Sequence, residues 1–540
     1  MSATLYTAAT IHTLTASDGG TGGDAPPVRG ILVDDERVVA TGDPAELAAH
    51  APAGTRTVDL GDAVVVPGLT DAHVHLTHLA DELAGVDLRS ATSEDECVRR
   101  VAAHVSTLRP GTWVFGGFWN INRWSTPESP SRRSLDAVTG DHPVALVSSD
   151  AHTIWANSAA LAALGITRDT PDPAGGAIAR DADGEATGVL RESAVFPVRA
   201  LQDGPAGGNP DDRFTRVQRH LLAQGLTGVH DVDGMTVLTS AQRLRDRGEL
   251  DLRLVKLLPV AALDEHIAAG RRTGDGDAWI RIGPVKIFAD GALGSHTCLM
   301  SHPFPAGDPR VTVEPSAAHG VEVTGPAALD ALLSRLVGNG LAAAVHAIGD
   351  RANAQVLDAF TRAEPATRAA GLRHRIEHVQ FLRRDDLPRL AELGVIASMQ
   401  PQHYVADLML QDLVPDPAIA AYAWRSVHDA GATLAFGSDA PVEPPRPLHG
   451  IAAAIARWDP EGVPGAWQPD EGLTARQALA AYTTGAAAAS GESAIKGTLA
   501  PGMLADLTVL DVDPLTAHPE AIRDATVLAT VVGGRVRHEA

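Results

Sequence analysis

The chain has 540 residues, and 44 lysines and arginines against 67 aspartates and glutamates give it a formal charge of −23. Its 44% hydrophobic and 21% charged residues are typical of a globular protein and exclude a long disordered chain. The negative charge repels phosphate backbones and anionic lipid, so we expect no nucleic-acid partner and no membrane role. Two cysteines, Cys97 and Cys298, cannot build a disulfide framework, and no apolar run reaches the roughly 18 residues of a membrane span. We therefore expect a cytoplasmic protein, for which a homo-oligomer is one open arrangement.

Both ends of the chain carry short β-type segments separated by turn residues. These segments are residues 4–14, 30–41, 55–66, 497–512 and 525–536. We expect residues 1–66 and 491–540 to pair into one small β-sandwich domain.

The middle of the chain, residues 67–490, alternates apolar strands with helical stretches. The expected strands are residues 64–75, 225–231, 252–260, 280–290, 341–347, 373–380, 394–400 and 432–439. Continuous apolar strands between helices indicate a buried parallel sheet, and eight of them favour a closed (β/α)8 TIM barrel, an α/β fold. The first connection is too long for one helical crossover, so we expect a large inserted subdomain at about residues 77–224.

The strongest local signal is the run Pro67-Gly68-Leu69-Thr70-Asp71-Ala72-His73-Val74-His75. Side chains at i and i+2 of a strand share one face, so His73 and His75 point together into the barrel mouth. Two imidazoles on one face suit a zinc-type ion, although an isolated pair of this kind is more often two hydrogen-bonded core histidines.

Polar residues end four other expected strands. Lys286 lies in an apolar strand, where burial favours the neutral amine that reacts with CO₂ to give a carbamate; a rim position or a pair with Asp290 is the alternative. His346, His378 and Asp439 each end an apolar run, at the edge where barrel enzymes place their chemistry. Any one of them could be structural, but five such coincidences are hard to attribute to chance.

The order His-x-His, Lys, His, His, Asp on strands one, four, five, six and eight resembles the amidohydrolase superfamily of metal-dependent hydrolases. The segments VPGLTDAHVH, KIFADGALGSHT, VHAIGD, RIEHVQ and GSDAPV resemble its family 3 branch, in particular the YtcJ-like group that includes N-substituted formamide deformylase. The resemblance covers nearly the whole chain. The resemblance is specific for the scaffold and the metals. It says little about the substrate, because members of the superfamily act on different substrates.

The resemblance implies a binuclear centre of two divalent ions, taken as zinc. The implied metal ligands are His73, His75, Lys286, His346, His378 and Asp439. The two histidines of the first strand and Asp439 would hold the more buried ion, the other two histidines would hold the second, and an N6-carboxylated lysine would bridge them. Such a centre activates water as hydroxide. Asp439 would be the general acid/base that moves a proton to the departing nitrogen.

Four further residues are candidates for contact with the substrate. They are Trp119, His152, His296 and His403. The first two lie in the expected insert, where core packing is the alternative for Trp119. His296 follows the flexible segment after strand four, and His403 follows strand seven, where an ordinary loop histidine is the alternative.

Two carboxylates beside the ligands, Asp71 and Glu377, are candidates to orient an imidazole through its second ring nitrogen. Adjacent side chains on a strand face opposite ways. We therefore expect Glu377 to face the helix layer.

The expected function is hydrolysis of a C–N bond other than a peptide bond in a small molecule: an amide, an N-acyl amine or an N-formyl amine. The same centre could act on an ester, lactone, carbamate or cyclic amide, or hold one ion with Lys286 uncarboxylated. A non-catalytic metal-binding barrel is a remote alternative. Aromatic residues are few, at 4%, and no cluster of Arg or Lys lies near the assigned strand ends, which favours a substrate of modest size that is an uncharged or mixed-polarity amide.

Overall fold

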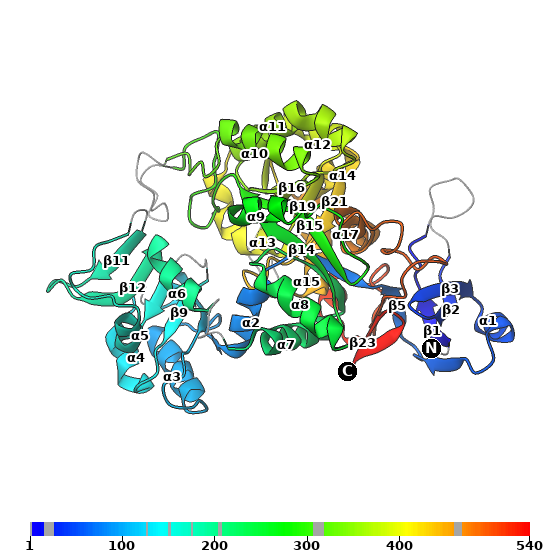
Figure 1. Ribbon diagram of the computed structural model, residues 1–540, viewed down its shortest axis with the longest axis horizontal. Coiled ribbons are helices and arrows are strands. Elements are labelled where there is room, and N and C mark those ends of the chain that lie inside the picture. The colour runs from blue at the N-terminus through cyan, green and yellow to red at the C-terminus, as the bar shows by residue number, and fades with distance from the viewer. Residues whose placement is uncertain are drawn as a thin grey trace. The chain divides into compact units, whose positions relative to one another are not determined.

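Eight apolar segments form one parallel sheet in the computed structural model of the chain (Figure 1). In chain order they are β6 (Leu69–Val74), β13 (Leu226–Asp231), β14 (Arg253–Pro259), β15 (Ile280–Phe288), β16 (Ala343–Ala347), β17 (Arg375–His378), β19 (Ile396–Met399) and β21 (Thr433–Phe436). Each strand pairs with the next in this order, and a bridge between Val74 and Ala440 brings the last strand beside the first. The sheet is therefore a (β/α)8 barrel, which confirms the predicted fold class. The structure describes residues 3–15, 26–125, 128–149, 153–173, 176–202, 208–305, 318–457 and 467–540.

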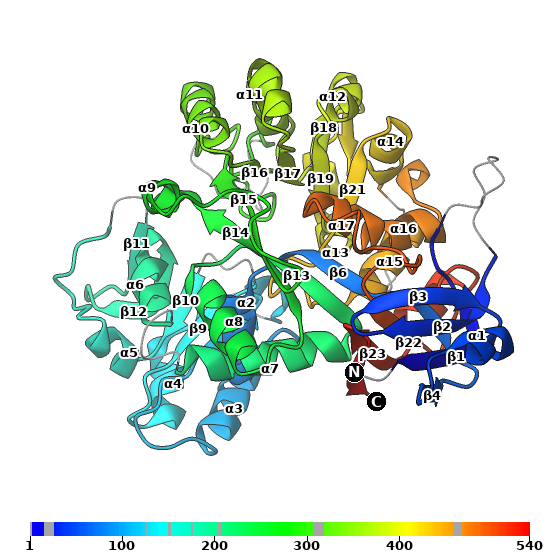
Figure 2. The same cartoon turned by 45° about the vertical axis from the view of Figure 1, so that its right-hand side comes forward.

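Helices fill the connections between the barrel strands (Figure 2). They are α8 (Thr236–Asp246), α9 (Leu263–Ala268), α10 (Pro326–Gly338), α11 (Asp350–Ala369), α12 (Leu387–Glu392), α13 (Pro401–Asp407), α14 (Trp424–Asp429), α15 (Pro447–Ala456), α16 (Ala475–Ala481) and α17 (Thr484–Ala489). α11 buries Val356, Leu357 and Phe360, the spacing that places side chains on one helical face against a core. Across the described ranges, no helix combines the length and apolarity needed to cross a bilayer.

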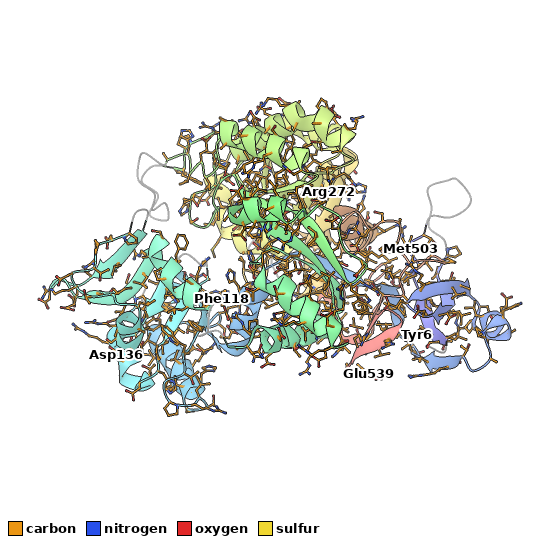
Figure 3. The ribbon with its side chains drawn as sticks, in the orientation of Figure 1. Tyr6, Phe118, Asp136, Arg272, Met503 and Glu539 are labelled. Atoms are coloured by element: carbon orange, nitrogen blue, oxygen red, sulfur yellow. The ribbon has the colours of Figure 1, made fainter. Side chains whose placement is uncertain are left out.

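The two ends of the chain pair into a second eight-stranded sheet. Its strands are β1 (Thr4–Ile11), β2 (Val28–Asp34), β3 (Arg37–Gly42), β4 (Arg56–Asp59), β5 (Val64–Pro67), β22 (Leu507–Leu510), β23 (Val527–Val532) and β24 (Arg535–Glu539). β5 joins the two ends, since it pairs in parallel with β1 and antiparallel with β22. The hydroxyl of Tyr6, labelled in Figure 3, donates to the carbonyl of Gly534 at 3.0 Å. α1 (Pro44–His50) and α18 (Pro519–Arg523) complete this β domain, which the sequence predicted.

Gly68 divides one extended segment between the two sheets. A Cβ at this position would lie 2.4 Å from Thr227 Oγ1 and 2.9 Å from Asp506 Cβ, so the close approach requires glycine. The strand expected at residues 64–75 is therefore two strands, β5 in the terminal sheet and β6 in the barrel.

Residues 76–217 form a separate unit inserted after the first barrel strand. Its elements are α2 (Leu76–Ala84), β7 (Val86–Asp87), α3 (Glu94–Val105), β8 (Gly116–Trp119), α4 (Arg132–Thr139), β9 (Ala145–Ser148), β10 (Thr153–Ala156), α5 (Ser158–Ala163), β11 (Gly176–Arg180), β12 (Ala186–Glu192) and α6 (Phe196–Gln202). The six strands form one sheet in the order β11-β12-β10-β9-β8-β7, and α7 (Pro210–Ala223) leads back to the barrel chain. An insert after strand one agrees with the predicted fold class.

A buried ion pair links the barrel to the terminal sheet. Arg253 on β14 donates from Nε and Nη2 to the two carboxylate oxygens of Asp506, at 2.7 and 2.9 Å. Both side chains are almost fully buried, and Asp506 also accepts from the backbone N–H of Gly533. Loss of Asp506 would remove the two hydrogen bonds that its carboxylate accepts from the buried Arg253 guanidinium, which is costly.

We expect Asp506→Ala to lower the free energy of unfolding by about 3–5 kcal/mol, because the buried Arg253 guanidinium then keeps only the partly exposed Glu36 carboxylate, 3.8 Å away, as a counter-charge. Urea denaturation followed by circular dichroism measures the change. Asp330→Ala is the matched control, since it removes the exposed partner of Arg362 and should cost at most about 1 kcal/mol. Equal shifts in the two variants would contradict the expectation.

Candidate metal centre

The carboxyl end of β6 meets the segment after β21 at two imidazoles and a carboxylate. His73 Nε2 and His75 Nε2 each lie 3.3 Å from Asp439 Oδ1. Ligand atoms of the three residues lie within 4.8 Å of one another. One divalent cation can span that spacing, since zinc–nitrogen bonds are about 2.0–2.1 Å long.

Two carboxylates orient these imidazoles. His73 Nδ1 donates to Glu377 Oε2, and His75 Nδ1 donates to Asp233 Oδ1, each at 2.6 Å. With Nδ1 protonated, each ring presents the lone pair of Nε2 toward Asp439, as a metal ligand does. The other candidate carboxylate, Asp71, accepts instead from the backbone N–H of His73.

The expectation that Glu377 faces the helix layer is wrong. Glu377 shares the inner face of β17 with Arg375, two residues earlier, which donates to it at 2.8 Å. His378 reaches the centre nevertheless, because its φ of +76° takes it out of the strand alternation. The His378 ring lies 5.0 Å from that of His73 and 4.4 Å from that of His346, measured between centroids.

Lys286 is buried on β15, with its Nζ 5.0 Å from the centroid of the Phe288 ring. Within the described ranges, no hydrogen bond or ion pair holds its Nζ. The alternative pair with Asp290 is not formed, because that carboxylate accepts three backbone N–H groups, from Leu299, Ile348 and Gly349. Burial lowers the pKa of Lys286 to about 8, against the opposing effect of Glu377 and Asp439. About a tenth of the amine is therefore neutral at pH 7, far more than for an ordinary lysine, and this is the form that reacts with CO₂.

Three groups of the cluster, His73, His346 and Asp439, have the protonation states of metal ligands. Burial lowers the pKa of His73 to about 4 and that of His346 to about 3, so both rings are neutral. Burial would raise the pKa of Asp439, but the neighbouring imidazoles hold it well below its usual range. Burial also lowers the pKa of His75, but Asp233 and Asp439 outweigh it and raise that pKa to about 10. The carboxylates of Asp233 and Asp439 therefore favour a positive charge at His75, and a bound divalent cation would supply that charge.

His346 ends β16, and its Nε2 lies 3.0 Å from the carbonyl oxygen of Gly291. Donation to that carbonyl leaves Nδ1 as the atom with a free lone pair. The ring lies 5.2 Å from that of Phe288, between centroids. His346 is thus beside His378 and near Lys286, at the edge where the sequence placed all three.

The structure brings one of the four substrate candidates to this cluster. His403, on α13, has its Nε2 3.6 Å from Asp439 Oδ2. His296 lies on the loop after β15 and packs edge-on against Phe304, with centroids 5.5 Å apart. Trp119 is buried in the core of the insert and donates to the carbonyl of Leu146, which favours the packing interpretation. His152 lies outside the described residues.

Sequence reasoning missed Asp233 and Arg375. Asp233 comes two residues after the end of β13, so its position beyond a strand end was a usable signal. Arg375 lies inside the barrel with 1% exposure and donates to Ala72 O, Ser398 Oγ and Glu377. An arginine within an apolar strand carries no pattern that predicts these distant partners.

A (β/α)8 barrel whose strand ends converge on imidazoles and carboxylates has the architecture of a metal-dependent enzyme. The chain belongs to the amidohydrolase family, whose model matches residues 56–538, so the predicted family is confirmed. It is 32% identical to YtcJ of Bacillus subtilis over 90% of this chain and 91% of that protein. It is 29% identical to N-substituted formamide deformylase of Arthrobacter pascens over 94% of each chain. A crystal structure of an uncharacterized metal-dependent hydrolase from Pyrococcus furiosus matches 95% of this chain and 100% of its own, with 29% identity and a TM-score of 0.76.

We predict that Asp233→Asn weakens zinc binding at His75 by about 10- to 100-fold, because the amide no longer fixes the Nδ1-protonated tautomer. Competition with a chromophoric chelator measures the affinity. Asp330→Asn on the exposed face of α10 serves as the control and should bind zinc as the wild type does. Wild-type affinity in Asp233→Asn would remove the orienting role from Asp233.

Proposed function

We propose that the protein is a metal-dependent hydrolase of a C–N bond other than a peptide bond in an amide, N-acyl amine or N-formyl amine. The observation that carries the proposal is the convergence of His73 and His75 on Asp439, at 3.3 Å each. The similarity to N-substituted formamide deformylase over 94% of each chain supports the same bond type. The similarity to a metal-dependent hydrolase of Pyrococcus furiosus supports the need for a cation.

The donor set fits divalent metal ions, taken as zinc. The neutral ring of His73 stands beside the ionised carboxylate of Asp439, and other carboxylates hold the Nδ1 atoms of His73 and His75. His73, His75 and Asp439 would hold one ion; His346 and His378 would hold the other, with carboxylated Lys286 between them. Bound there, two ions would lower the pKa of a water molecule and polarise the substrate carbonyl.

Asp439 performs the proton transfer in this proposal. Its carboxylate stays ionised because His73, His75 and His378 lower its pKa. It therefore accepts a proton from the attacking water and gives that proton to the departing nitrogen. An amine leaves only when protonated, so without this step the addition of water would reverse.

We expect Asp439→Asn to lower kcat for N-benzylformamide by about 10²- to 10⁴-fold, the usual contribution of a general acid/base. Zinc content, measured by mass spectrometry on the same sample, should remain. Asp330→Asn is the control for both measurements. Wild-type turnover by Asp439→Asn would remove Asp439 from proton transfer, and faster wild-type hydrolysis of benzyl acetate than of the amide would favour ester chemistry.

The wall of the site beside Lys286 is apolar. Phe288 shares a strand face with Lys286 and is 43% exposed, although its neighbours on β15 are buried. Its ring lies 5.2 Å from that of His346, so it borders the proposed reacting centre. A substrate with an uncharged, apolar group would cover this ring and gain from its burial.

We predict that Phe288→Ala raises KM about 10-fold for N-benzylformamide, the equivalent of about 1.4 kcal/mol of lost contact. N-methylformamide, which cannot reach the ring, should show little change. Phe288→Leu retains an apolar side chain and serves as the matched variant. An equal rise in KM for both formamides would contradict this position for the apolar group.

We also propose a cytoplasmic location and a small-molecule substrate. Cys97 and Cys298 are both free, buried thiols, which fits a reducing compartment.

A further inference from the structure

His403 reaches the centre from a helix, unlike the other imidazoles. α13 begins at Pro401, two residues after the end of β19, and His403 lies in its first turn. The His403 side chain points inward, and only 8% of the residue is exposed. The next residue, Tyr404, is fully buried and its hydroxyl donates to the carbonyl of Arg457 at 2.8 Å. The helix therefore holds the His403 ring in one place.

The two oxygens of Asp439 face different imidazoles. Oδ1 lies 3.3 Å from Nε2 of both His73 and His75, whereas Oδ2 lies 3.6 Å from Nε2 of His403. His378, His403 and Asp439 form a second group of buried residues whose ligand atoms lie within 4.8 Å of one another. Asp439 thus stands between two sets of nitrogen donors, each of a size that one divalent cation spans.

Nitrogen atoms of this second set have no other partner. Among the described residues, neither Nε2 of His403 nor Nδ1 of His378 has a hydrogen-bond partner, and both atoms are buried. Burying such an atom unpaired costs free energy. A cation bound to these imidazoles would recover that loss.

Gln380 can set the tautomer that His403 needs. The side-chain amide of Gln380 lies against His403 Nδ1, with nitrogen facing nitrogen at 3.4 Å, and its Oε1 is buried without a partner. Rotation of the amide by half a turn lets Oε1 accept a hydrogen bond from Nδ1–H. The lone pair of Nε2 is then directed toward Asp439 Oδ2.

We propose that His403 is a ligand of the second divalent cation, together with His378 on the Oδ2 side of Asp439. This inference rests on the proposed metal-dependent function. It adds to the ligands predicted at the ends of the barrel strands one that lies on a helix. Each carboxylate oxygen has two lone-pair sites, so Oδ2 can line this position and still accept a proton.

Anomalous diffraction at the zinc edge from crystals of the full wild-type chain with bound zinc tests the inference directly. We expect two peaks, one of them about 2.0–2.1 Å from His403 Nε2. A second peak bound to Lys286 and away from His403 would overturn the inference. One peak, at His73 and His75 alone, would overturn it but leave the proposed function intact, and no peak at all would overturn both.

Zinc content per chain provides a second measurement. We expect the zinc content of His403→Asn to fall from two ions per chain to one. His302→Asn, at an exposed histidine outside the centre, is the matched control and should keep two. Circular dichroism confirms that each variant is folded. Two ions in folded His403→Asn would contradict the inference.

Discussion

The closure of the barrel between its first and last strands is the constraint on which the site depends. Asp71 Oδ1 accepts from the backbone N–H groups of His73 and Ser438 at 3.0 Å each, and Oδ2 accepts from the Ser438 hydroxyl at 2.6 Å. Asp71 and Ser438 are 367 residues apart in the chain. A Cβ at Gly437 would lie 2.5 Å from His73 N, so glycine is required for this approach. Without the closure, Asp439 would not meet the imidazoles of β6.

A second layer of buried charge supports the imidazoles. Arg375 donates to Glu377, the partner of His73, at 2.8 Å. Lys256 donates to Asp231 at 2.7 Å and to the carbonyl of Asp233, whose carboxylate orients the ring of His75. A lone charge in this interior would be destabilising, and each pairing offsets that cost. The layer thus fixes ring orientation independently of any bound cation, which is how a site is preorganised.

The sequence predicted the structure well in the regular strands. The barrel and its eight strands in order follow from apolar runs that alternate with helices, and the β domain of the two ends follows from short β-type segments between turn residues. His73 and His75 lie on a strand with ordinary alternation, so their shared face could be derived from spacing alone. Lys286 and His346, at the ends of β15 and β16, followed from the same reasoning and meet at adjacent strand ends. The metal-binding roles of these residues stay predictions.

Periodicity failed where the backbone leaves regular geometry, and those positions lie at the site. His378 and Asp439 have φ angles of +76° and +59°, a region that residues other than glycine rarely adopt. The positive φ turns His378 to the face that Glu377 already occupies, which no alternation rule allows. His403 depends on a helix that begins at Pro401 immediately after a strand, so its direction follows from the turn and not from the strand. Backbone strain of this kind persists only where the surrounding packing holds it, and here it directs the side chains of His378 and Asp439 toward each other.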